Sequence, residues 1–137
     1  MASGEGSSAA MRAFGADFAE ADCLMLAEVA TVLKQQADAH EEALRAGTTS
    51  EGLKDTFLKT LEYAQRFNHI TEMQSIMDTR TMLEQAGLEP VQLAAMANLM
   101  PRSVAEARSL IPSLTERACS DDVLEGLINR LQELQRM

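Results

Sequence analysis

The residues best suited to chemistry in this sequence are two histidines and two cysteines, and their spacing does not assemble a site. His40 and His69 are the only histidines, and neither belongs to an HxxxH or CxxC…H pattern of the kind that binds zinc. Cys23 and Cys119 lie far apart without CxxC spacing, which favours free thiols in a reducing compartment over a disulfide framework. We therefore expect no metal ion, no cofactor and no catalytic residue.

Acidic pairs such as Glu41-Glu42 and Asp121-Asp122 could in principle supply acid–base catalysis. Each pair has a simpler interpretation, either as a solvated helix face or as favourable charge in a first helical turn. The sequence also lacks the phosphate-binding loop of nucleotide enzymes, because no glycine is followed by Lys-Ser or Lys-Thr. A small enzyme is therefore the weakest of the alternatives.

Composition indicates a small helical protein with an acidic surface. The chain has 137 residues, enough for one domain or for a smaller domain plus an arm that borrows a partner's core. It is 46% hydrophobic but only 4% aromatic, and its net charge of -9 repels phosphate and anionic lipid. No segment has the apolar length of a signal peptide or membrane span, so we expect the cytoplasm or nucleus. Residues 1–12 are predicted to be a disordered leader.

Helix boundaries can be predicted from capping residues. A helix should begin at about Leu26 and end at Gly47, followed by a capping box at residues 48–51 and a second helix that reaches about Asn68. A second capping box at residues 71–74 should open a third helix, which ends at Gly87. Pro90 suits the first turn of a fourth helix.

Two prolines limit a short fifth helix. Pro101 and Pro112 cannot lie inside a helix, and Ser103 with Glu106 forms a capping box directly after the first of them. A last helix should follow Ser120 and continue to the C-terminus, with an apolar stripe along one face.

The feature that points most clearly to function is an apolar arm at the start of the chain. Its large residues lie in a segment whose continuation is polar. They are Phe14, Phe18, Leu24, Leu26, Val29 and Val32. Such an arm either folds back on its own domain or docks on another protein, and we favour docking.

Two long runs in the sequence are similar to a known family. They are FLKTLEYAQRF, residues 57–67, and LAAMANLMPRSVAEARSLIPSL, residues 93–114. Both resemble the fourth subunit of eukaryotic RNA polymerase II, a stalk subunit that has a counterpart in the archaeal RNA polymerase. The segment CLMLAEVATVL, residues 23–33, is similar to the part that precedes the first helix of that family. The loop around residues 37–51 is short, whereas some members carry a long charged insertion there.

The resemblance implies an all-α fold, in which a partner-docking arm and helix, residues 13–47, precede an HRDC-like helical domain, residues 48–137. It further implies a non-catalytic, nuclear stalk subunit of a DNA-directed RNA polymerase, expected to be RNA polymerase II. The implied partner is the OB-fold-containing seventh subunit, and through it the polymerase core near the RNA exit path, where the pair would support initiation and factor docking. We expect the six arm residues above to contact this partner, together with Tyr63 and Phe67.

A free-standing HRDC-type nucleic-acid-binding module is the alternative. Arg102, Arg108 and Arg117 surround the short helix and could contact a phosphate backbone. Acidic residues lie among these arginines, so we expect nucleic acid to be contacted only indirectly, through the partner subunit.

Overall fold

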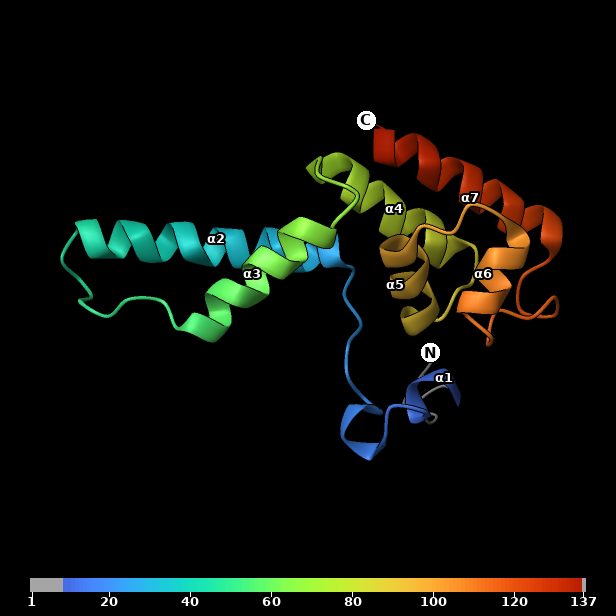
Figure 1. Ribbon diagram of the computed structural model, residues 1–137, viewed down its shortest axis with the longest axis horizontal. Coiled ribbons are helices and arrows are strands. Elements are labelled where there is room, and N and C mark those ends of the chain that lie inside the picture. The colour runs from blue at the N-terminus through green and yellow to red at the C-terminus, as the bar shows by residue number, and fades with distance from the viewer. Residues whose placement is uncertain (1–8, 137) are drawn as a thin grey trace.

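The computed structural model describes residues 9–136, and within this range the protein is all-α, as predicted (Figure 1). These residues form seven α-helices and one 3-10 helix and contain no strand. The elements are α1 Ala9–Arg12, η1 Ala16–Phe18, α2 Leu26–Arg45, α3 Asp55–Phe67, α4 Met73–Gln85, α5 Pro90–Leu99, α6 Val104–Leu110 and α7 Asp121–Arg136. No helix in this range is long and apolar enough to cross a membrane.

The helices fall into three groups in space. Helices α2 and α3 pack together as a hairpin that projects from the body formed by α4, α5, α6 and α7, while α1 and η1 lie at a third corner (Figure 1). Residues 21–25 form a non-helical connection between η1 and α2. The arrangement of α4 to α7 is consistent with the expected HRDC-like domain.

The body owes its stability to a continuous aliphatic core. Its buried members include Leu83 of α4, Met96 of α5 and Leu124 of α7. Met25 and Ala27 belong to the same core, so the beginning of α2 is inserted into the body while its remaining turns extend outward. Complete burial of a side chain such as Met25 stabilises the fold by about 1.5–3 kcal/mol. The hairpin is therefore anchored at its base.

Two glycines end helices as the sequence predicts. At Gly47, with φ of 75°, the N–H of Thr48 donates to the carbonyl of Ala43 at 3.0 Å and completes a Schellman motif. Gly87, with φ of 85°, ends α4 in the same way.

The predicted capping boxes at Thr48 and Thr71 are wrong. Thr48 is used to finish α2, because its hydroxyl also donates to the carbonyl of Ala43 at 3.1 Å. Helix α3 begins only at Asp55, after an extended Lys54, and Glu72 rather than Thr71 precedes α4.

The short helix between the prolines forms as predicted. The Ser103 hydroxyl accepts a hydrogen bond from the N–H of Glu106 at 3.1 Å, and α6 ends at Leu110, ahead of Pro112. The Glu106 carboxylate accepts from the N–H of Arg102 at 2.9 Å. Met100 takes a left-handed conformation before the buried Pro101, a position where proline disfavours a right-handed helical residue.

The N-terminal segment is folded against the body over the part that can be described. Residues 9–12 form α1, which the expected leader of residues 1–12 did not include, and residues 1–8 lie outside the described range. Met11 is buried, and the Cys23 thiol lies 3.4 Å from its sulfur. Helix α1 also packs near α5. The division of the chain at residues 12 and 47 stays a prediction, and α3 packs mainly on α2 rather than on the body.

Candidate protein-binding groove between α2 and α4

Most of the residues predicted to bind a partner have large exposed side chains. Six of the eight are between 44% and 60% exposed: Phe14, Phe18, Leu24, Val32, Tyr63 and Phe67. The other two, Leu26 and Val29, are half-buried at the start of α2. Exposed apolar groups of this size, when they occur together, mark interaction surfaces.

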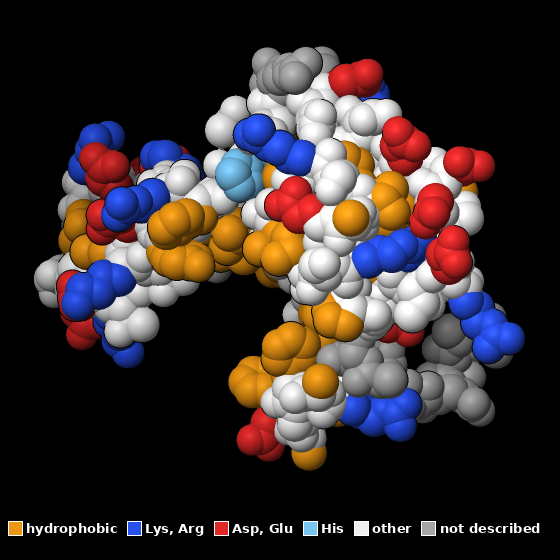
Figure 2. Space-filling model, turned by 45° about the vertical axis from the view of Figure 1, so that its right-hand side comes forward, with side chains coloured by type: hydrophobic (Ala, Val, Ile, Leu, Met, Phe, Trp, Pro, Cys, Tyr) orange, Lys and Arg blue, Asp and Glu red, His pale blue; other side chains and the backbone are white. Residues whose placement is uncertain are grey.

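An open notch separates the α2–α3 hairpin from the N-terminal segment (Figure 2). Hydrophobic side chains are seen on the hairpin and on the N-terminal segment, where the two face each other across an open space (Figure 2). On α3, the Tyr63 and Phe67 rings lie 4.8 Å apart, and the Arg66 guanidinium lies 5.5 Å from the centre of the Phe67 ring. The hairpin therefore carries a small aromatic cluster on its surface.

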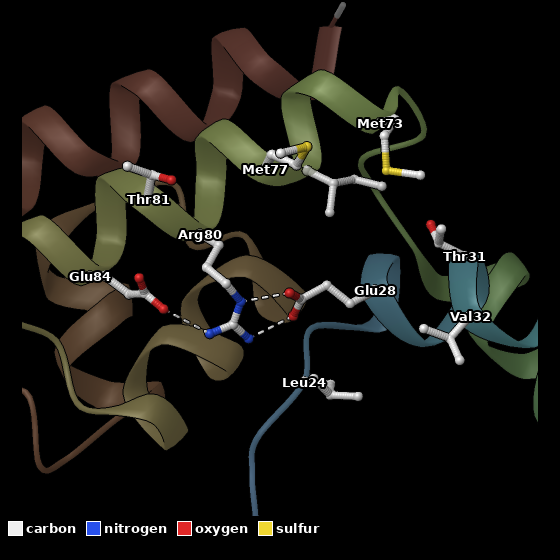
Figure 3. Close-up of a pocket in the computed structure, with 10 residues that line it drawn as sticks. Leu24, Glu28, Thr31, Val32, Met73, Met77, Arg80, Thr81 and Glu84 are labelled. Carbon is white, nitrogen blue, oxygen red and sulfur yellow. Dashed lines mark hydrogen bonds and ion pairs between the residues drawn. The ribbon is translucent and has the colours of Figure 1, made fainter.

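Leu24 and Val32 line a groove that the sequence did not reveal. The groove has a volume of about 390 Å³ and lies between the N-terminal half of α2 and the length of α4 (Figure 3). Exposed Met73 and Met77 form its α4 side. Ile76, Thr31 and Thr81 complete the apolar and neutral lining. We call this feature the α2–α4 groove.

An ion network lies at one end of the α2–α4 groove. The Arg80 guanidinium donates to both carboxylate oxygens of Glu28, in one case at 2.6 Å, and to Glu84 Oε1 at 3.1 Å (Figure 3). It also donates to the carbonyl of Cys23 at 3.0 Å. The Glu28 carboxylate also accepts from the N–H of Met25 at 2.8 Å. One arginine therefore joins α4 to α2 and to the connection that precedes it.

Electrostatics keep this network ionised. Burial alone would raise the pKa of Glu28, but the hydrogen bonds from Arg80 and from the Met25 N–H outweigh it and hold that pKa below its usual value. The hydrogen bond to Glu28 is the main reason that the pKa of Arg80 is raised. With two carboxylates and one guanidinium, the network carries one excess negative charge.

The titratable side chains of the described residues do not converge on a metal site. No group of three or more histidine, cysteine, aspartate or glutamate residues within 9–136 is arranged to hold a metal ion. Cys119 is buried, and this burial raises the pKa of its thiol, so it is less readily ionised than a free cysteine.

Sequence reasoning missed the α4 side of this groove. Met73, Ile76 and Met77 recur at helical spacing, but of these three only Ile76 is buried. The spacing Met73, Met77, Arg80, Glu84 follows one helix face and could have indicated a second stripe. The ion pair between Glu28 and Arg80 joins residues 52 positions apart, so no local spacing pattern in the sequence indicates it.

Within the described residues the protein is small and all-helical, and its surface carries an apolar groove with an ion network at one end. Residues 23–135 match the sequence profile of the family described as RNA polymerase Rpb4. Because this match covers most of the chain, the chain belongs to the RNA polymerase Rpb4 family.

Three relatives with established names are similar to this chain. DNA-directed RNA polymerase II subunit rpb4 of Dictyostelium discoideum is 41% identical over 81 residues, which is 59% of this chain and 51% of the relative. DNA-directed RNA polymerase II subunit 4 of Arabidopsis thaliana is 28% identical over 138 residues, 99% of each chain. Subunit RPB4 of Saccharomyces cerevisiae is 29% identical over 96 residues, 70% of this chain and 42% of the relative. The match thus spans about half of the Dictyostelium protein and nearly all of the Arabidopsis protein.

Proposed function

We propose that this protein is a non-catalytic stalk subunit of DNA-directed RNA polymerase II and acts in the nucleus. The observation that carries the proposal is membership of the RNA polymerase Rpb4 family over residues 23–135. The relatives from Dictyostelium and Arabidopsis are both named as subunits of RNA polymerase II. In this role the chain supports transcription initiation by assembling with other subunits rather than by reacting with a substrate.

The proposed direct partner is the seventh subunit, which carries an OB-fold. The exposed apolar residues of the N-terminal segment and the hairpin support a protein partner, because an interface core is depleted of charge and rich in such side chains. Phe14 and Phe18 in the N-terminal segment and Tyr63 and Phe67 on α3 supply exposed aromatic groups, which often dominate binding energy. We expect the pair to lie near the RNA exit path and to offer a docking surface to transcription factors.

The charge and the arginines of the chain favour this role over direct binding of nucleic acid. The net charge is -9. Arg108, the central arginine of the alternative hypothesis, donates to the carbonyls of Leu114 and Cys119 and to Asp121, at 2.7, 3.0 and 2.6 Å. It therefore links α6 to the start of α7 and has little capacity left for a phosphate group.

Co-purification tests the proposal. The tagged full chain, expressed at its natural level in its own cells, should recover the seventh subunit and the largest subunit of RNA polymerase II in near-equal amounts. A recombinant pair of the chain and the seventh subunit should elute as a 1:1 complex in gel filtration. Recovery of neither subunit, together with tight and salt-sensitive RNA binding by the chain alone, would overturn the proposal in favour of a nucleic-acid-binding module.

A further inference from the structure

We propose that the α2–α4 groove receives a segment of the seventh subunit that presents an apolar side chain beside a lysine or arginine. This inference rests on the proposed function and extends the interface to α4, where Met73, Met77 and Glu84 were not among the predicted contacts. The apolar side chain would contact the part of the lining that includes Val32, Met73 and Met77, and the cation would face Glu84.

The need for an apolar group follows from the lining of the groove. Leu24, Val32, Met73 and Met77 come from three parts of the chain, yet all line this groove and all are at least 44% exposed. Water covers this surface at a free-energy cost, which a partner's apolar side chain would remove. Methionines adapt their shape to an incoming group, so two of them on one wall suit a binding surface better than a rigid core.

The need for a cation follows from the ion network. Arg80 is the only basic residue that lines the groove, and it already donates to Glu28, Glu84 and the Cys23 carbonyl. The Glu28 side chain is 19% exposed and the Glu84 side chain 56% exposed, so the excess negative charge is accessible at Glu84. A wholly apolar partner would remove water from this carboxylate without replacing its interactions. A lysine or arginine would pair with it.

The same charges argue against the other occupants. An acidic segment would meet Glu84, and Arg80 has no free pair of donors to offer it. A second copy of this chain would bring another molecule of net charge -9 against an already negative groove. A basic, apolar segment of the partner subunit is the chemistry that remains.

Binding of the full chain to the purified seventh subunit, measured by titration calorimetry, tests the inference. Met77→Asp places a charge on the apolar wall, and Glu84→Lys reverses the charge at the rim. Both residues are exposed, and circular dichroism should confirm that both variants fold. Val123→Asp and Glu125→Lys make the same changes at exposed positions of α7 that do not line the groove.

We expect each groove variant to bind at least about tenfold more weakly than the natural chain, and each α7 variant to bind within about twofold of it. Glu84→Gln should lose less affinity than Glu84→Lys and should weaken the dependence of binding on salt. If the natural chain binds but Met77→Asp and Glu84→Lys bind equally well, the groove is not part of the interface and only this inference fails. If Met77→Asp binds weakly but Glu84→Lys binds normally, the partner does not place a lysine or arginine beside Glu84, and that part of the inference is wrong. If the natural chain does not bind the seventh subunit, the proposed function fails as well.

Discussion

Replacing Arg80 with alanine should weaken the joint that holds the hairpin to the body. In the folded protein this guanidinium joins α4 to Glu28 of α2 and to the carbonyl of Cys23. Without it, the Glu28 carboxylate keeps only the hydrogen bond from the N–H of Met25. The variant therefore leaves a largely buried charge without its partner.

The cost can be estimated from the exposure of the two groups. The side chains of Arg80 and Glu28 are 27% and 19% exposed, so the pair is partly hydrated. Removing one member of a fully buried pair costs about 3–5 kcal/mol, and a hydrogen bond to a charged group contributes about 1.5–3 kcal/mol. We expect Arg80→Ala to lower the free energy of unfolding by about 2 kcal/mol. For a domain of this size that is a fall in Tm of about 6–10 °C.

Thermal and urea unfolding followed by circular dichroism would measure this change. The matched control is Arg45→Ala, which removes an arginine from an exposed pair with Glu41, where the side chains are 77% and 62% exposed. Exposed pairs contribute about 0–1 kcal/mol, so the control should shift Tm by only a few degrees. If Arg80→Ala is no more destabilising than Arg45→Ala, the network does not hold the joint and our account of the groove's base is wrong.

Two further predictions concern pH and backbone conformation. Because the folded pKa of Glu28 is lowered, its ionised form stabilises the fold above the unfolded pKa, and this contribution is lost as pH falls through the folded value. Glu28→Gln should thus destabilise the protein at neutral pH but have much less effect at about pH 3, and equal destabilisation in urea titrations at both pH values would contradict this. Gly87→Ala should cost about 1 kcal/mol, since Gly87 has φ of 85° with open space around it, whereas Gly126→Ala inside α7 should stabilise by about 0.5–1 kcal/mol. If Gly87→Ala stabilises the protein, or if both variants change the free energy of unfolding in the same direction, the assignment of a left-handed cap at Gly87 is wrong.

Local signals made much of the helical architecture predictable. Gly47, Gly87, Pro90 and Ser103 each perform one conformational task that few other residues perform as well, so they mark helix ends correctly. Thr48 was misleading because a threonine after a helix-ending glycine can either cap the next helix or complete the previous one. The backbone bond to Ala43 decides for the second possibility, and a local sequence pattern does not reveal it.

The α2–α4 groove was only half predictable, because apolar periodicity does not separate buried residues from exposed ones. The apolar arm residues could be singled out in the sequence because the segment that follows them is polar. On α4 the buried residues Ile76 and Leu83 and the exposed Met73 and Met77 are interleaved, so the two stripes read as one wide hydrophobic face. Only the tertiary structure shows that Met25 enters the core beside them and that Arg80 reaches across to Glu28.

Hydrogen exchange of the full chain, alone and in complex with the seventh subunit, tests the central claim most directly. If the chain binds this partner through the arm and the α2–α4 groove, amides in residues 14–32 and 73–84 should exchange more slowly in the complex. Amides of α6 and of the following turn, residues 104–120, should exchange at the same rate in both samples. Slower exchange confined to residues 104–120, or no change anywhere in the chain, would contradict the account.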